Sequence, residues 1–524
     1  MPTQIKVVDL FAGPGGLGEG FSSFVDDKGH RPFKIALSVE KEPSAHATLT
    51  LRAFYRQFND GQAPAEYYQF LRGQKGKSPD DELYKLDKYR SEIDAARREA
   101  RCLTLGEDNA AIDSALAKAV GKGEDCILIG GPPCQAYSLV GRARRNGMVG
   151  YHAEEDGRNF LYREYLRILK KSRPMIFVME NVKGILSARI EGNLVFERII
   201  EDLTDPWKGR GGKESRYRVM SMVVPSENQT TVPHDYIIRM EKFGIPQARH
   251  RVILLGVRED IFSGRAIKLL KHRQSSVVKK VIGDLPRLRS GLSKARASAN
   301  WLSVVQGIHA ICAEVGSHEL FGGRKVAKAI AVAAEAASLV PDSRGDNFSR
   351  SAEGLNLHKN MSDRLRHWYL AGNQPSLLCN HETRGHIAGD LHRYMFGAAW
   401  ALVAQQEEWD RPFPKPENYP PSLRPKHANF SSGDFADRFR VQTAERVATT
   451  VTSHISKDGH YFIHYDPAQC RSLTVREAAR IQTFPDNYFF LGNRTQQYVQ
   501  VGNAVPPLLA YDIAEIVAGM LTGH

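Results

Sequence analysis

The chain has 524 residues, of which 42% are hydrophobic, so it is long enough for one large core and a second domain. Lysine and arginine total 72 against 59 acidic residues, and the formal charge of +13 favours a polyanionic partner such as DNA or RNA. The six cysteines are scattered without a CxxC pair, which argues against a disulfide framework or a zinc site, and no leader or long apolar run indicates secretion or membrane insertion. We therefore expect a protein of a reducing cytoplasm.

The first half of the chain predicts alternating strands and helices. A charged stretch at 52–101 interrupts this alternation, and we expect an amphipathic surface helix within it. Alternation of this kind is typical of a mixed-to-parallel, Rossmann-like α/β sheet. The expected strands are "IKVVDLF", "KIALSVE", "CILIGG", "PMIFVMENV", "YRVMSMVV" and "HRVILLGVR", and "FLYREYLRILKKS" is an expected helix.

The second half of the chain loses this alternation after about residue 286. Six prolines between 411 and 425 exclude an interior strand or helix there, and "TVTSHISKDGHYFIHYD" (450–466) predicts a hairpin with "KDG" as its turn. Thr474 and Glu477 form the pattern of a capping box at the start of a helix, and "PPLLAYDIAEIVAGML" predicts a final apolar helix. We expect a catalytic domain at 1–285, a smaller, irregular domain at 286–465, and helices at 466–524 that return to the first domain.

Glycines and acids follow the expected strands, where α/β folds bind nucleotides. "DLFAGPGGLGEGF" follows the first strand, and its glycines allow the backbone to approach a ligand closely. Glu40 ends the next strand, where a carboxylate can hold two ribose hydroxyls. The combination indicates a nucleoside-type cofactor.

A cysteine, an acid and two arginines are expected at the same carboxyl edge of the sheet. Cys134 stands in "GGPPCQAYS", where prolines and glycines restrict the position of its sulfur. Glu180 ends the strand "PMIFVMENV", and Arg249 and Arg251 in "QARHR" alternate and so share one direction. A thiol nucleophile, an acid and paired arginines beside a nucleoside cofactor indicate attack on an electron-poor ring.

These stretches resemble, in order, the motifs of the DNA (cytosine-5) methyltransferase family of prokaryotic restriction-modification systems. The matching stretches are "DLFAGPGG", "GGPPCQAYS", "MENV", "FGIPQARHRV", "RSLTVREAARIQTFP" and "QVGNAVPP". The resemblance covers most of the chain. The matching motifs leave out the insertion at 52–101, the basic glycine-rich loop "WKGRGGKESR" (207–216) and the variable domain at 286–465.

The resemblance implies a mechanism and a set of site residues. Cys134 would add to carbon 6 of a flipped-out cytosine, and Glu180 would bind the exocyclic amine and protonate ring nitrogen 3. Arg251, with Arg249 beside it, would support the base carbonyl and the DNA backbone. The family has a motif whose acid binds the adenine of the cofactor, and "TLGEDNA" matches this motif poorly. It offers Glu107 or Asp108, and we assign the role to Asp108. The residues expected to bind S-adenosylmethionine are Phe11, Ala12, Gly13, Gly15, Gly16, Leu17, Glu40, Lys41, Asp108, Pro132, Leu161, Asn503 and Ala504.

The domain at 286–465 is expected to read DNA sequence in the major groove, as the corresponding domain of the family does. His381 and Glu382 open like HExxH, but His386 falls five residues on, so we expect no metal site. The predicted partner is double-stranded DNA, with a cognate restriction endonuclease or defence system as a further partner, and the predicted oligomeric state is a monomer. Two alternatives stay open: a tRNA cytosine-5 methyltransferase, and an idle DNA-binding scaffold of the same fold.

Overall fold

The structure is a computed structural model. The residues it describes are 4–58, 62–121, 123–133, 161–190, 193–225, 232–264, 266–293, 300–350, 361–370, 377–425 and 439–521. They divide into two compact units. Unit 1 comprises Met1–Gln62, Ser78–Gln274 and Ala504–His524, and unit 2 comprises Ala63–Lys77 and Ser275–Asn503. These units are defined by how compactly the residues pack, whereas the domains expected from the sequence are defined by their motifs. The domain boundaries at 285/286 and 465/466 therefore stay a prediction.

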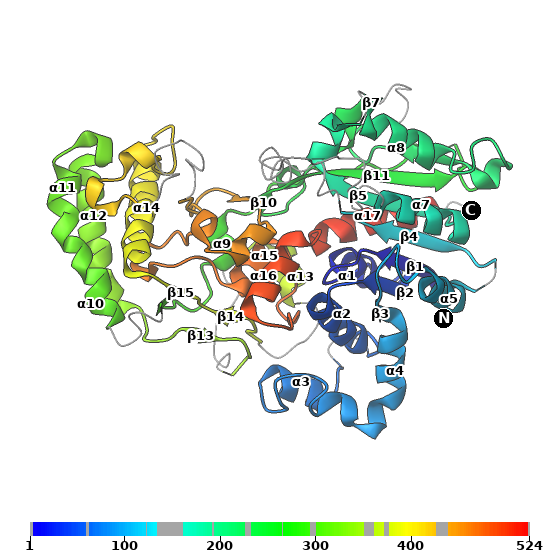
Figure 1. The fold of residues 1–524 in the computed structure, drawn as a ribbon, viewed down its shortest axis with the longest axis horizontal. Helices are drawn as coiled ribbons and strands as arrows, with labels where there is room; N and C mark the ends of the chain where they lie inside the picture. Colours follow the sequence, from blue (N-terminus) through cyan, green and yellow to red (C-terminus); the bar gives the residue numbers. More distant parts are fainter. Residues whose placement is uncertain are drawn as a thin grey trace. The chain divides into compact units, whose positions relative to one another are not determined.

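The centre of unit 1 is a twisted, mainly parallel sheet (Figure 1). Its strands run in the order β3-β2-β1-β4-β5-β11-β8, with β9 also paired to β11. The first five of these are mutually parallel, whereas β11 is antiparallel to β5, β8 and β9. The bounds are β1 Ile5–Leu10, β2 Phe33–Glu40, β3 Ala100–Cys102, β4 Cys126–Gly130, β5 Ile176–Val182, β8 Tyr217–Met220, β9 Ile237–Arg239 and β11 His250–Arg258.

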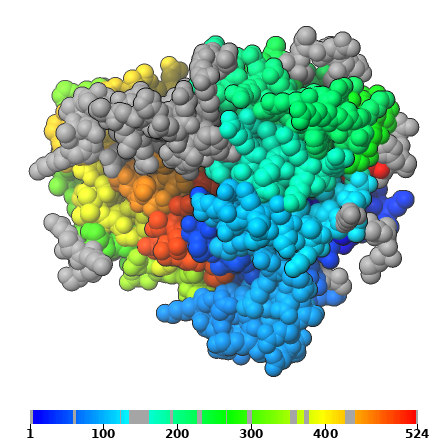
Figure 2. Space-filling view, turned by 45° about the vertical axis from the view of Figure 1, so that its right-hand side comes forward, coloured from blue at the N-terminus to red at the C-terminus, as the bar shows by residue number. Residues whose placement is uncertain are grey.

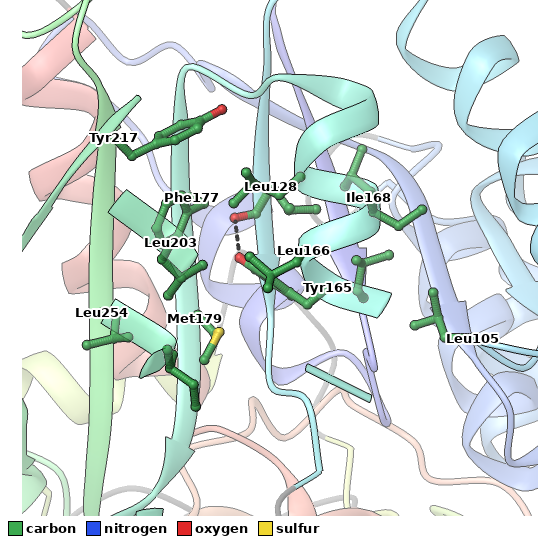
Figure 3. Packing of buried hydrophobic residues seen from close by; sticks show 14 of the residues in the cluster. Leu105, Leu128, Tyr165, Leu166, Ile168, Phe177, Met179, Leu203, Tyr217 and Leu254 are labelled. Carbon is green, nitrogen blue, oxygen red and sulfur yellow. Dashed lines mark hydrogen bonds between the residues drawn. The ribbon is translucent and has the colours of Figure 1, made fainter. Parts of the chain in front are cut away.

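Helices cover both faces of this sheet. Val8 and Leu10 of β1 point toward a core that contains residues of α5, α7 and α8, part of which Figure 3 shows. Asp9 points to the other face, where it lies against Gly18 of α1, and α1 in turn packs on α17. Because the strands are buried on both faces, they are almost continuously apolar. The bounds are α1 Gly16–Ser23, α2 Pro43–Tyr55, α4 Arg90–Glu99, α5 Asn109–Val120, α7 Leu161–Ser172, α8 Val195–Thr204 and α17 Pro507–Leu521.

The sequence predicted this unit well. Each expected strand of the first half is present, although β8 takes up only the first half of "YRVMSMVV". The mixed α/β class with a mainly parallel sheet is confirmed. The expected helix of the insertion is α4, and in Figure 2 much of the insertion, coloured blue, lies at the surface.

Unit 2 contains more helix than the sequence suggested. As expected, it has no strand–helix alternation among its described residues, but a helical core forms from α10, α12 and α14. The helices are α3 Ala65–Leu71, α9 Val278–Ile282, α10 Trp301–Gln306, α11 Cys312–Gly316, α12 Gly323–Ala336, α13 Asp363–Leu370, α14 Ala388–Gln406, α15 Val475–Ile481 and α16 Arg494–Asn503. The short strands are β12 Gly291–Leu292, β13 Gly345–Asp346, β14 His381–Glu382, β15 Gly385–His386 and β16 Ala448–Thr449.

Two local predictions in unit 2 have opposite outcomes. The hairpin at 450–466 is wrong, because the segment forms the 3-10 turns Ser453–Ser456 and His460–Phe462 instead of two paired strands. The capping box is confirmed: the Thr474 hydroxyl accepts the Glu477 N–H at 3.2 Å, and a Glu477 oxygen accepts the Thr474 N–H at 2.7 Å.

The stretch Arg494–Leu521, which comprises α16 and α17, has the length and apolarity of a membrane-crossing helix. Its most apolar window is 72% buried within the protein. Core helices of globular proteins have the same composition, and α17 packs on α1, so the stretch is weak support for a membrane span.

Candidate active site

One row of residues marks the carboxyl edge of four adjacent parallel strands. Val39 of β2 pairs with Leu10 of β1, Leu10 pairs with Gly130 of β4, and Gly130 pairs with Met179 of β5. The next residue along each of the four strands lies at this edge, and these residues are Glu40, Phe11, Gly131 and Glu180. The strand order reverses between β1 and β4, and at such a reversal open α/β sheets bind their ligands.

The loop after β1 turns sharply into α1. Phe11, Gly13 and Gly15 all have positive φ (55°, 57° and 94°). Phe11 is strained in this backbone conformation because, unlike glycine, it carries a side chain. The Gly13 N–H donates to Oε2 of Glu40 at 2.8 Å, and Oε1 of Glu40 accepts the Glu42 N–H at 2.8 Å. Glu40 therefore fixes the loop and its own backbone at once.

Two glycines of this loop have opposite surroundings, because Gly13 faces open space and Gly16 is closely packed. A Cβ added to Gly13 would meet no atom within 4 Å, whereas one added to Gly16 would lie 2.2 Å from the Val505 carbonyl oxygen. Gly13 thus borders open space beside the Glu40 carboxylate, and Gly16 lets α1 approach the start of α17. An open backbone turn next to a fixed acid at a strand end fits a nucleoside-type methyl donor.

The other expected cofactor residues differ in their surroundings. Ala12 and Leu17 are buried, and Lys41 is exposed. The Leu103 N–H donates to the Glu40 carbonyl at 3.1 Å, so the turn that contains Asp108 starts beside Glu40.

In that turn, Oδ2 of Asp108 accepts the Thr104 N–H at 2.7 Å, and Glu107 is exposed. Leu161 is the first residue of α7 and is half-buried. Ala504 is buried in unit 1, whereas the exposed Asn503 ends α16 in unit 2.

The expected acid and one expected arginine form a pair at this edge. Arg251 lies opposite Val182 in the β5–β11 ladder, so Glu180 is its diagonal neighbour on the same face. Nε of Arg251 lies 2.9 Å from Oε1 of Glu180, and the two side chains are 15% and 13% exposed. The pair is therefore oriented yet still reachable from solvent.

The glycine before Pro132 brings the cysteine loop against this acid. A Cβ on Gly131 would lie 2.9 Å from Oε2 of Glu180, so a larger residue here would displace the carboxylate from its present position. The Asn181 amide donates to the Pro132 carbonyl at 3.2 Å and ties the loop to the end of β5. Cys134 itself lies outside the described residues, and its loop leaves the sheet beside Glu180.

Arg249 is placed differently from Arg251. Its side chain is 1% exposed, and burial, with the nearby Arg251 cation, lowers its pKa well below the usual value. The structure brings the two arginines near Glu180, but only Arg251 reaches solvent. Arg249 is thus suited to orient its neighbours rather than to meet the DNA backbone.

Sequence reasoning missed two polar residues of this edge. Asn181 was visible as the middle residue of "ENV", but its bond to the cysteine loop depends on strands far apart in the chain. Asp9, 1% exposed beneath the loop after β1, has a pKa raised to about 8, chiefly by burial, with Glu40 and Glu99 adding to it. An acid inside an apolar strand was its signal.

The residues that resembled a zinc motif lie on short strands, not on a helix. Nδ1 of His381 lies 3.0 Å from the Thr474 hydroxyl, and its Nε2 lies 3.0 Å from the Pro286 carbonyl. Both nitrogens of His381 therefore have structural partners. Within the described ranges, no group of three or more metal-binding side chains is found. The expectation of a metal-free site stays a prediction.

Comparison with known proteins gives a consistent result. The model of a family described as C-5 cytosine-specific DNA methylase matches residues 112–316 and 380–518. The Type II methyltransferase M.Bpa9945I of Bacillus paralicheniformis is 32% identical over 99% of both chains. The DNA (cytosine-5-)-methyltransferase M.ApeKI of Aeropyrum pernix is 26% identical over 75% of this chain and 81% of its own.

A solved structure is also similar: a putative DNA modification methyltransferase of E. coli encoded within a prophage, at 17% identity and a TM-score of 0.47, covers 99% of this chain and 100% of its own. The sheet, the matching family model and the 32% identical relative define the class as an α/β methyltransferase that acts on DNA. Within that class, the chain belongs to the C-5 cytosine-specific DNA methylase family, and it is an enzyme, a DNA (cytosine-5-)-methyltransferase.

Proposed function

We propose that the chain transfers a methyl group from S-adenosylmethionine to carbon 5 of a cytosine flipped out of double-stranded DNA, through a covalent adduct with Cys134. The observation that carries this proposal is the row at the carboxyl edge. It sets Glu180, the base of the Cys134 loop and the glycine turn beside Glu40 on consecutive neighbouring strands.

The thiolate and the acid act together in this mechanism. The Cys134 thiolate forms a bond to carbon 6 while Glu180 delivers a proton to ring nitrogen 3, so the added electron pair is held as an enamine instead of an anion. Carbon 5 then takes the methyl group, and the electron pair of the broken methyl–sulfur bond would stay on the donor's sulfur. A base removes the proton from carbon 5, the electron pair of that C–H bond forms the carbon 5–carbon 6 double bond and expels the thiolate, and ring nitrogen 3 returns its proton to Glu180.

Arg251 prepares the acid for this role. Its bond to Oε1 of Glu180 leaves Oε2, which faces Gly131, as the oxygen directed toward the cysteine loop. Arg251 is also exposed enough to approach the base carbonyl, and the buried Arg249 adds a second positive charge near it. Flipping the base costs a few kcal/mol, which contacts to the DNA backbone recover.

S-adenosylmethionine supplies the electrophilic methyl group when it is bound. On the protein side, Glu40 is positioned to bind the ribose hydroxyls, Phe11 and Gly13 border the open space beside it, and Asp108 is the proposed partner of the adenine. Lys41, Pro132, Leu161, Asn503 and Ala504 complete the proposed cofactor set.

The biological setting is inferred from the relatives. Those compared here are named as Type II methyltransferases or as a DNA (cytosine-5-)-methyltransferase, so we infer a restriction-modification or phage-defence role with a cognate endonuclease as partner. We also infer that the chain acts as a monomer in the bacterial cytoplasm, with residues 286–465 reading the DNA sequence.

Bisulfite sequencing of DNA from cells that express the chain tests the proposal. The intact chain should protect cytosines in one short sequence context, and Cys134→Ser should protect none. Cys312→Ser is the matched control, because that thiol lies on α11 in unit 2, and it should protect like the intact chain. Protection by Cys134→Ser would refute the adduct, and no protection by any form would leave RNA as the substrate to test.

A further inference from the structure

The basic loop 207–216 lies at the opposite edge of the sheet from the candidate active site. It connects α8 to β8, and β8 is antiparallel to β11, with Tyr217 opposite Arg258. Arg251, the second residue of the same strand β11, lies at the catalytic edge. Seven residue steps along the extended strand separate Arg251 from Arg258, which is roughly 23 Å.

Six cations gather at this far edge around the end of β11. The Arg258 guanidinium donates to the Arg173 carbonyl at 2.6 Å, and the Arg216 carbonyl accepts the Glu259 N–H at 3.0 Å. The Arg173 guanidinium also lies over the Trp207 ring at 5.3 Å, which holds the loop against the end of α7. We call these residues the far-edge basic surface, and they are the exposed Arg173, Lys208, Arg210, Lys213, Arg216 and Arg218.

The acids of this edge do not neutralise the loop. Asp125 and Asp260 pair with Arg258 at 3.4 and 2.7 Å. Asp205, just before the loop, accepts the Gly209 N–H at 2.7 Å and lies 4.0 Å from Arg216, and Glu214 accepts the Gly212 N–H at 3.3 Å.

The acids are therefore used to shape the backbone, while three of the cations stay unneutralised. The side chains of Lys208, Arg210 and Lys213 make no ion pair or hydrogen bond with any described residue. A compact loop with three such cations is a binding surface for a polyanion.

We propose that the far-edge basic surface binds the phosphate backbone of a second segment of duplex DNA, apart from the segment at the active site. DNA is the substrate of this family, so duplex is the polyanion that surrounds the enzyme. A second contact at the opposite edge of the sheet holds the enzyme on long DNA while the active site is empty, and it speeds transfer between segments. The contact is independent of sequence because only phosphates are bound.

The triple variant Lys208→Gln, Arg210→Gln, Lys213→Gln tests this inference. Its control is Lys28→Gln, Lys85→Gln, Lys118→Gln, which removes the same charge from three exposed lysines elsewhere in unit 1. Binding to a long random-sequence duplex is measured against salt concentration. Each lost phosphate contact lowers the slope of log K against log salt by about 0.9, so the loop variant should lose up to about 2.7 and the control much less.

Methylation separates this contact from catalysis. A duplex much shorter than the persistence length of about 150 bp cannot fold back to reach both edges. Both variants should methylate short duplexes of mixed sequence as fast as the intact chain. On long DNA at limiting enzyme, only the loop variant should methylate more slowly than the intact chain.

Three results would overturn the inference. One is equal salt slopes for the loop variant and the control. Another is a loss of methylation on short duplexes as large as on long ones, which would place the loop in the catalytic DNA path. The third would come from a binding assay with poly-glutamate as the polyanion. If the loop variant lost poly-glutamate binding but bound DNA like the intact chain, the surface would bind an acidic protein partner instead. An intact chain that binds DNA but methylates none would instead refute the proposed function and leave the binding comparison valid.

Discussion

Two arginine–carboxylate pairs in this protein have the same chemistry and opposite surroundings. Arg251 and Glu180 in unit 1 are 15% and 13% exposed, whereas Arg480 and Asp486 in unit 2 are 0% and 7% exposed. Arg480 also binds Asp284 at 2.7 Å. The exposed pair can exchange its partner for a substrate, and the buried one cannot without loss of structure. Solvent access thus separates a pair suited to chemistry from one that maintains the fold.

The largest expected effect is a loss of turnover on substitution in the partly exposed pair, Arg251 and Glu180. Glu180→Gln keeps the shape of the side chain but removes the proton donor, and a general acid contributes about 10²–10⁴-fold to turnover, or about 2.7–5.5 kcal/mol. Stability should change by less than about 1 kcal/mol, because the pair is partly exposed. Single-turnover methylation and thermal unfolding are the measurements.

Glu197→Gln on the exposed surface of α8 is the matched control for this change, and it should retain full turnover. Turnover of Glu180→Gln above a tenth of that of the intact chain would contradict its role as the acid.

The buried pair should show the reverse behaviour. Burial alone would lower the pKa of Arg480, but Asp486 and Asp284 outweigh it and raise the pKa. Arg480→Ala would remove this cation from the buried Asp284 and leave Asp486 with Arg476, 3.8 Å away, which costs about 3–5 kcal/mol of unfolding free energy. Urea unfolding followed by tryptophan fluorescence reports mainly on unit 2, which holds four of the five tryptophans.

Arg446→Ala, at an exposed position of the same unit, is the control for this loss. An urea midpoint of Arg480→Ala close to that of Arg446→Ala would show that the buried pair adds no stability.

The smallest expected effect is a pH dependence of unit 2. Burial lowers the pKa of His381 to about 4, so the folded chain keeps this ring neutral where the unfolded chain, with a pKa near 6.5, takes up a proton. The stabilisation is therefore complete above pH 6.5 and lost between about pH 6.5 and 4, on the order of 3 kcal/mol. Urea unfolding at a series of pH values measures it.

His381→Gln sharpens this prediction. The variant should be less stable at pH 7 but should lose less stability on acidification, because glutamine does not titrate. Parallel pH curves for the variant and the intact chain would contradict the assignment.

The sequence predicted those parts of the protein whose structure is set locally. The strands of unit 1 are apolar runs ended by glycine or acid, and the Thr474 capping box lies within four residues, so both could be read directly. The segment 450–466 was misread as a hairpin because its "KDG" turn is real, but the flanking residues pair with other parts of the chain: Ile463 bridges Val441 and Ser472.

The candidate site was predictable as a set of residues but not as a geometry. The order of the motifs indicated Glu180, Arg251 and Glu40. The strand register adds that Glu40 and Glu180 lie in the same row across the carboxyl edge of the sheet. The contact between Gly131 and the Glu180 carboxylate, and the burial of Arg249, depend on residues about 50 to 70 positions apart. No local pattern records such contacts.

The fit of Gly16 against the Val505 carbonyl has a consequence for synthesis of the enzyme. The glycine turn that borders the proposed cofactor space emerges first from the ribosome, but the helix it packs on, α17, is made almost 500 residues later. At about 5–20 residues per second, roughly 25–100 s pass between the two. A nascent chain therefore cannot complete this site, so methylation begins only after translation has passed α17.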